Sequence, residues 1–194
     1  MALILASGSP RRLELLRQLG IEPVVRPADI DESVHDGEAP DDYVRRIALG
    51  KANTVLAEPD HVVLAADTTV IIDGLILGKP VDEPDTRAML HRLSGRRHVV
   101  LTAVTIRTMD HTVTDVEEST VTFSPLSDQD IEWYVLTGEP ADKAGAYGVQ
   151  GAGGLFVSSI DGSTDNIIGL PRALTARLFD DLGLRLLDFS QFGA

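Results

Sequence analysis

The chain has 194 residues, with 17 lysines and arginines against 30 aspartates and glutamates, and its formal net charge is −13. Hydrophobic residues make up 43% of it and charged residues 24%, a composition typical of globular proteins. The acidic balance argues against general binding to nucleic acid or to anionic membranes, because both need a broad basic face. The absence of cysteine excludes disulfides, thiolate zinc sites and a cysteine nucleophile, and it fits a cytoplasmic protein.

The length suits a single domain over residues 1–194, built from two lobes. The N-terminal segment does not resemble a secretory signal, because its basic residues follow the short apolar run instead of preceding it. No run of about 18 apolar residues occurs, so no transmembrane helix is expected.

Apolar runs and amphipathic periods alternate along the chain. In the first half, the predicted elements are a strand over residues 2–6, a helix over 10–19, a strand over 22–26, an acidic loop over 27–42, a helix over 40–56, a strand over 61–66 and a hairpin over 69–77. Gly20 closes the first helix, and Asp73-Gly74 is a strong hairpin turn.

The second half continues the same alternation. Its predicted elements are a helix over residues 83–93, paired strands over 99–107 and 112–123, a helix over 128–137, a glycine-rich segment over 145–154, a strand over 156–159 and a helix over 171–182. This order predicts an α/β fold, a mixed twisted sheet with flanking helices.

The turn after the first predicted strand reads SGSPRR and begins at Ser7. Ser9 is a good helix N-cap, and Pro10 fits the first helical position. Arg11 and Arg12 then fall in the first turn, where the helix dipole disfavours cations by about 0.3–1 kcal/mol each. A bound anion would remove this conflict, since backbone N–H groups, hydroxyls and guanidinium groups would all face it. An ordinary capped helix with solvated arginines explains the pattern equally well, so both interpretations stay open.

One carboxylate, Asp67, interrupts a long apolar run. Burying an unpaired carboxylate is costly, so we expect Asp67 at a strand end, where it is paired or holds a metal ion; a turn-capping role is the alternative. Only three lysines occur: Lys51, Lys79 and Lys143. Taken alone, each is better explained as a solvated surface lysine.

Residues 21–42 carry eight carboxylates and one arginine. Most are expected to be solvated, but a subset could hold a hard divalent cation through oxygen ligands. The histidines show no ligand spacing and receive no role. A Walker-type NTPase is disfavoured because GxxxxGK[ST] is absent, and the glycines of residues 148–154 have the wrong place and spacing for a Rossmann turn.

Eight short segments, taken together, resemble the Maf family of nucleoside triphosphate pyrophosphatases, and the resemblance covers nearly the whole chain. The segments are LASGSPRR (5–12), DE (31–32), ALGKA (48–52), ADTTV (66–70), GKP (78–80), DKAGAYGVQG (142–151), IDGS (160–163) and GLP (169–171). Their order and spacing are highly specific. Thr164 departs from the pattern, because family members often have an aromatic residue there.

The resemblance implies an elongated two-lobed fold of the Maf/ITPase type with a central cleft. It implies hydrolysis of a nucleoside triphosphate to the monophosphate and pyrophosphate, with a divalent metal cation (Mg²⁺, Mn²⁺ or Co²⁺), as house-cleaning of the nucleotide pool. The SPRR, DT and VQG segments occur together as in the branch that acts on dTTP and UTP, so these and modified pyrimidine nucleotides are the expected substrates. A cytoplasmic homodimer is expected.

The resemblance and residue chemistry together imply the site roles. Asp67 matches the family's catalytic acid and is expected to orient the attacking water or accept its proton, and the division of Asp67 between base and metal ligand stays open. Lys51 and Lys79 are expected to neutralise charge on the leaving pyrophosphate, and Glu32 and Asp67 to hold the metal. The expected substrate-binding residues are Ser7, Ser9 and Arg12 for the triphosphate and Arg11, Thr68 and Gln150 for the base.

Two other functions stay open on the sequence alone. One is a nucleotide-binding regulator of cell division without turnover. The other is a purine-directed pyrophosphatase that acts on ITP or XTP.

Overall fold

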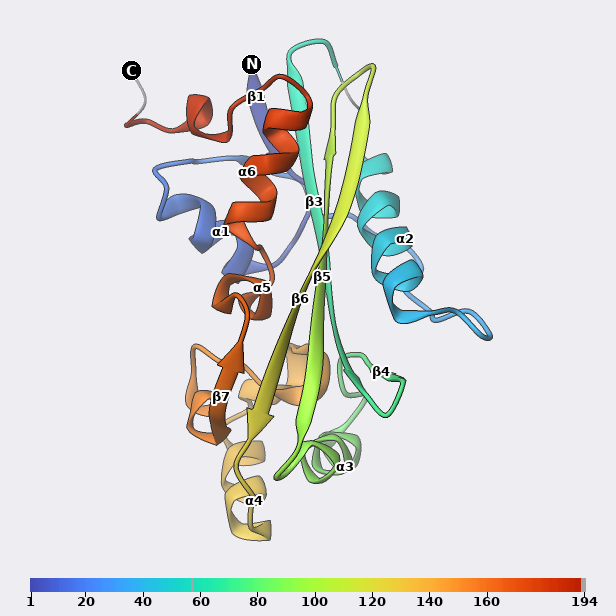
Figure 1. The fold of residues 1–194 in the computed structure, drawn as a ribbon, viewed down its shortest axis with the longest axis vertical. Helices are drawn as coiled ribbons and strands as arrows, with labels where there is room; N and C mark the ends of the chain where they lie inside the picture. Colours follow the sequence, from blue (N-terminus) through green and yellow to red (C-terminus); the bar gives the residue numbers. More distant parts are fainter. Residues whose placement is uncertain (57, 193–194) are drawn as a thin grey trace. The chain divides into compact units, whose positions relative to one another are not determined.

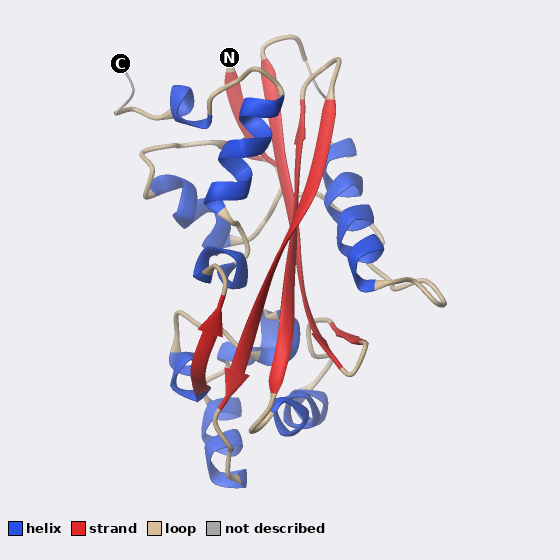
Figure 2. Cartoon of the chain, viewed as in Figure 1, coloured by secondary structure: helices blue, strands red, loops and turns tan. Residues whose placement is uncertain are grey.

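Strands and helices alternate along the chain (Figure 2). The computed structural model describes residues 1–56 and 58–192. The strands are β1 (Ala2–Leu5), β2 (Val24–Val25), β3 (His61–Ile72), β4 (Leu75–Leu77), β5 (Arg97–Arg107), β6 (Thr112–Phe123) and β7 (Val157–Asp161). The α-helices are α1 (Pro10–Arg17), α2 (Pro40–Asn53), α3 (Glu83–Leu93), α4 (Asp128–Leu136), α5 (Thr164–Ile168) and α6 (Arg172–Asp181). The 3₁₀ helices are η1 (Glu139–Asp142), η2 (Ala144–Ala146), η3 (Ala152–Phe156) and η4 (Leu186–Phe189).

The strands form one seven-stranded sheet in the order β2-β1-β3-β5-β6-β7, with β4 paired to β3 (Figure 1). β1 is parallel to β2 and to β3, whereas β4 is antiparallel to β3 and β7 to β6. The predicted fold class, a mixed sheet flanked by helices, is therefore confirmed. Among the described helices, none combines the length and apolar character needed to span a membrane.

Several predicted boundaries were wrong, among them those of the second strand. The predicted strand over residues 22–26 is reduced to two residues, Val24–Val25. Pro23 and Pro27 flank it, and proline has no N–H group to donate to a sheet ladder. The helix α5 was not predicted. The tail after Gly183 forms η4 and a bridge between Ile21 and Ser190.

The chain divides into two compact units. Unit 1 contains Met1–Asp67, Thr102–Glu117 and Gly169–Ala194, and unit 2 contains Thr68–Leu101 and Glu118–Ile168. The long strands β3, β5 and β6 contribute residues to both units. A single two-lobed domain around a cleft stays a prediction.

In unit 1, α1 and α6 lie on one side of the strands and α2 on the other (Figure 1). A buried cluster joins the C-terminal half of α2 to β1 and β3; its members are Ile4, Ala6, Ala52, Val55, Val63 and Ala65. Because Ala52 belongs to this cluster, the preceding residue, Lys51, is held close to the strand that carries Asp67.

Unit 2 has an aromatic core. The rings of Phe123 and Tyr147 meet edge to face at 4.8 Å, and those of Tyr134 and Phe156 at 5.0 Å. His98, near the start of β5, meets Phe123 edge to face at 5.0 Å. Such pairs contribute about 0.5–1.5 kcal/mol each beyond the area they bury. This core fixes α4, and with it the glycine-rich loop described below.

His98 makes the stability of unit 2 depend on pH. It is 2% exposed, its Nε2 lies 2.9 Å from the Tyr147 hydroxyl, and burial lowers its pKa to about 4. The unfolded chain, with a histidine pKa near 6.5, therefore binds an extra proton between pH 6.5 and pH 4. Protonation then favours unfolding, so the stability from neutral His98, roughly 3 kcal/mol, is present above pH 6.5 and lost as pH falls towards 4.

The His98→Gln variant tests this dependence, because its amide still reaches the Tyr147 hydroxyl but does not titrate. We expect a flatter dependence of the free energy of unfolding on pH between 6.5 and 4, measured by urea denaturation. Carboxylates contribute equally to both proteins, so the difference between the two curves isolates His98. Parallel curves would contradict the assignment.

Candidate active site

The centre of the site is a buried ion pair between a strand and a helix of unit 1. Lys51, in the last turn of α2, donates from Nζ to Asp67 Oδ1 at 2.7 Å. Asp67 is 6% exposed and Lys51 8% exposed, so little water reaches either charge. The same Nζ lies 2.8 Å from Glu32 Oε1. One ammonium group thus brings together two carboxylates from distant parts of the chain.

The prediction that Asp67 lies at a strand end was wrong. β3 runs without a break from His61 to Ile72, and Asp67 is in its interior. The expectation rested on the cost of burying an unpaired carboxylate, and Lys51 offsets part of that cost by supplying the opposite charge. The predicted pairing of Asp67 is therefore confirmed, and Lys51 is a buried partner, not a solvated surface lysine.

The first turn of α1 holds a second buried cation. Arg12 is 8% exposed; its Nε donates to the Gly169 carbonyl at 2.8 Å, and its Nη1 donates to Ser7 Oγ at 3.0 Å. Burial lowers the pKa of Arg12, and the Asp67 carboxylate opposes that shift. The charges of Arg12 and Asp67 are therefore close enough to influence each other.

Ser9 occupies the N-cap position, with Pro10 as the first helical residue, as predicted. Its side chain makes no capping hydrogen bond; instead the Ser9 N–H donates to Ser7 Oγ at 3.2 Å. The first turn of α1 contains no acidic residue, and both the half-buried Arg11 and the buried Arg12 lie in it. Two serines and two arginines thus gather at the positive end of a helix, an arrangement suited to an anion.

The loop that carries Glu32 is held by α2. The Tyr43 hydroxyl donates to the Glu32 carbonyl at 3.1 Å. Burial, and then the charges of Asp67 and Glu32, raise the pKa of Tyr43 to about 12, so it stays a neutral donor. Arg46 donates to the Ser33 carbonyl at 2.9 Å. Tyr43 was missed by sequence reasoning, although it lies two helical turns before Lys51, on the same face of the helix.

The remaining predicted site residues belong to unit 2. Thr68 follows Asp67 directly in β3 and is half-buried. Lys79 follows β4, and Gln150 lies in the loop between η2 and η3; both are exposed. For these three residues the site role stays a prediction. Glu139 and Tyr134, which contact the Gln150 loop, were not predicted.

The carboxylates offer a limited set of metal ligands. Within residues 1–56 and 58–192, no group of three or more histidine, aspartate or glutamate side chains is arranged to hold a metal ion. Glu32 and Asp67 nevertheless converge on one point, the Lys51 ammonium. A Mg²⁺ ion commonly uses one or two carboxylates and takes its other ligands from water and substrate phosphates, so a pair is chemically sufficient.

The family model and the curated relatives, compared by sequence, agree with each other. The family described as Maf-like protein matches residues 2–182. A dTTP/UTP pyrophosphatase of Anaeromyxobacter dehalogenans strain 2CP-1 is 52% identical over 188 residues, 95% of each chain. A dTTP/UTP pyrophosphatase of Neisseria meningitidis serogroup B is 48% identical over 191 residues, 94% of this chain and 95% of the relative. Among solved structures, the Ham1 protein of Staphylococcus aureus aligns with a TM-score of 0.44 and 15% identity, over 66% of this chain and 73% of that one.

Proposed function

This chain belongs to the Maf-like protein family, and on that premise we propose that it hydrolyses dTTP and UTP to the nucleoside monophosphate and pyrophosphate. The observation that carries the proposal is the Asp67–Lys51 pair with Glu32 and the buried Arg12 in one site. A site that only binds nucleotides needs cations, but it does not need a buried carboxylate. Modified pyrimidine triphosphates are included in the substrate class.

The triphosphate is bound by Ser7, Ser9 and Arg12 in this proposal. Arg12 is already oriented by the Gly169 carbonyl and by Ser7 Oγ, so little side-chain entropy is lost when the phosphates bind. Charge-assisted hydrogen bonds from guanidinium groups to phosphate oxygens are among the strongest in proteins. The binding energy from this turn places the α-phosphate for attack.

Asp67 is the proton acceptor. Lys51 engages Oδ1, so we assign Oδ2 to the attacking water. The water oxygen bonds to the α-phosphorus, the bond from that phosphorus to the bridging oxygen breaks, and the water proton passes to Asp67. Lys51, and Lys79 beyond β4, neutralise the charge that grows on the departing pyrophosphate.

Glu32 and Asp67 are the residues that would hold a divalent cation, Mg²⁺, Mn²⁺ or Co²⁺. Their oxygens lie within 2.8 Å of one ammonium nitrogen, and this shared contact with a positive charge supports a cation at the same position. When bound, such an ion supplies Lewis-acid polarisation of a phosphoryl oxygen. In the absence of the ion, Lys51 keeps the two carboxylates together.

Base selection is assigned to Gln150, with Arg11 and Thr68 as further contacts. A glutamine amide has one acceptor oxygen and two donor hydrogens, which suit the donor–acceptor edge of a pyrimidine. The curated relatives are named dTTP/UTP pyrophosphatases, and these names support a pyrimidine as the selected base. The cytoplasmic homodimer implied by the family resemblance is proposed on that ground alone.

Release of pyrophosphate from a panel of nucleotides tests the function. We expect dTTP and UTP to be hydrolysed with kcat/KM at least about tenfold above ITP, XTP, GTP and ATP, a ratio that one well-placed hydrogen-bonded contact can supply. Each nucleotide is assayed with Mg²⁺, with Mn²⁺, with Co²⁺ and with a chelator. A preference for ITP or XTP would favour a purine-directed enzyme, and binding without release would favour a regulator.

A further inference from the structure

The C-terminal end of the loop that carries Gln150 is anchored by one carboxylate, that of Glu139. This loop, residues 148–153, precedes and enters η3 in unit 2. Glu139 Oε2 accepts a hydrogen bond from the Ala152 N–H at 2.7 Å, and Oε1 accepts one from the Gly153 N–H at 3.2 Å. Hydrogen bonds to an ionised acceptor are roughly twice as strong as neutral ones. The C-terminal end of the loop is therefore fixed by Glu139.

The Tyr134 hydroxyl anchors the other end. The Gly148 N–H donates to Tyr134 Oη at 3.1 Å, and Oη donates in turn to Glu139 Oε1 at 2.8 Å. Tyr134 is fully buried, and its ring meets Phe156 edge to face, so the hydroxyl has a fixed position. Gln150 lies two residues from the anchor on either side.

The loop backbone lies directly against the anchor. A Cβ atom on Gly151 would overlap the Glu139 carboxylate, and one on Gly153 would come within 2.5 Å of the Tyr134 hydroxyl. Glycine at these positions permits the close approach. Partial burial raises the pKa of Glu139, but the hydrogen bonds from Ala152, Tyr134 and Gly153 together outweigh it and hold that pKa below its usual value. Glu139 is thus an ionised acceptor at neutral pH.

We propose that Glu139 and Tyr134 are positioning residues that direct the Gln150 amide and thereby determine which nucleobase is accepted. The inference rests on the proposed function, in which Gln150 contacts the base. Gln150 is exposed, and the backbone of the loop sets the point from which its side chain extends. A displacement of about 1 Å at a hydrogen-bonding group is enough to reduce the discrimination it provides.

Two variants with different chemistry test the anchor in the full-length chain. Glu139→Gln places a neutral amide opposite the same backbone N–H groups, and Tyr134→Phe keeps the buried ring but removes the hydroxyl. We expect Glu139→Gln to lower the ratio of kcat/KM for dTTP to that for GTP by about tenfold, mainly through the KM for dTTP. Tyr134→Phe is expected to lower the same dTTP-to-GTP ratio. This variant tests the positioning role if Glu139→Gln does not fold.

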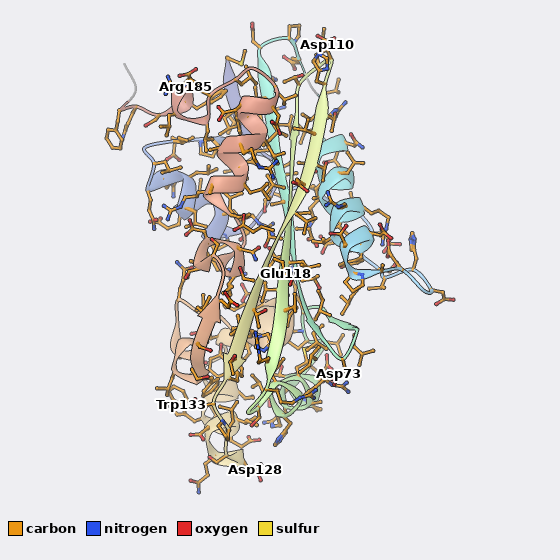
Figure 3. All side chains as sticks on the ribbon, viewed as in Figure 1. Asp73, Asp110, Glu118, Asp128, Trp133 and Arg185 are labelled. Atoms are coloured by element: carbon orange, nitrogen blue, oxygen red, sulfur yellow. The ribbon has the colours of Figure 1, made fainter. Side chains whose placement is uncertain are left out.

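A double variant separates positioning from stability. In the Gln150→Ala background, adding Glu139→Gln leaves the dTTP-to-GTP ratio unchanged, because the side chain being positioned is already absent. Glu118→Gln, an exposed glutamate of the same unit labelled in Figure 3, loses the same charge and keeps the wild-type ratio.

The outcomes distinguish this inference from the proposed function. If Gln150→Ala shifts the ratio but neither anchor variant does, the inference is overturned and the base contact stands. An equal loss of kcat/KM for both nucleotides in the anchor variants would overturn it as well, since that indicates a structural role. If Gln150→Ala itself leaves the ratio unchanged, the base contact assigned to Gln150 is wrong, and the inference falls with it.

Discussion

Asp67→Asn is expected to lower kcat for dTTP roughly a thousandfold, within the 10²–10⁴ range that a general base contributes. The amide has nearly the shape of the carboxylate, and its oxygen still accepts from Lys51, so the fold is retained. It does not accept a proton from water, and it removes one of the two charges proposed to hold the metal ion. The loss should therefore appear in kcat at saturating nucleotide, measured as pyrophosphate release.

Asp110→Asn is the matched control for this variant. Asp110 is an exposed aspartate in the turn between β5 and β6, it belongs to unit 1 like Asp67, and it is labelled in Figure 3. The two variants change the net charge equally, so only a local effect separates them. Wild-type turnover by Asp67→Asn with saturating Mg²⁺ or Mn²⁺ would remove Asp67 from the mechanism.

Three of the site residues stand out in the sequence because each carries a physical conflict, whereas the roles of the others were implied by the resemblance to the Maf family. Arg11 and Arg12 oppose a helix dipole, and Asp67 places a charge in an apolar run. Such conflicts are expected where a ligand or a partner resolves them. The alternation of apolar runs and amphipathic periods likewise predicted the mixed sheet, because both are local patterns.

The pairing inside the site could not be predicted in the same way. Lys51 and Asp67 meet only because α2 packs on β3, and an isolated lysine in a helical period has no local signal that it is buried. The same packing explains why β3 continues through Asp67, whereas the local sequence pattern predicted that the strand ends before it. Tyr43 and Glu139 were missed for a related reason: each holds the backbone of a loop, and the loop's path is a tertiary property.

Lys51→Met should destabilise the protein strongly, and not merely inactivate it. The methionine fills the apolar part of the lysine's volume but leaves Asp67, 6% exposed, without the ammonium group to which it is hydrogen-bonded. Breaking a buried pair in this way costs roughly 3–5 kcal/mol. For a chain of 194 residues that corresponds to a fall in Tm of about 10 °C, measured by calorimetry or circular dichroism. Turnover should fall as well, since Lys51 is proposed to neutralise the leaving pyrophosphate.

The double variant Lys51→Met, Asp67→Asn distinguishes a lost charge balance from lost packing. Removing both charges eliminates the uncompensated carboxylate, so we expect most of the lost stability to return while turnover stays at the level of Asp67→Asn alone. Asp67→Asn by itself should cost little stability, because Lys51 keeps its contact with Glu32 at 2.8 Å. Arg185→Met, at an exposed position of unit 1 labelled in Figure 3, serves as the control; its exposed ion pair with Asp188 contributes at most about 1 kcal/mol. If the double variant were as unstable as Lys51→Met, the lysine would act through packing of its methylene groups, and its charge would be needed only for turnover.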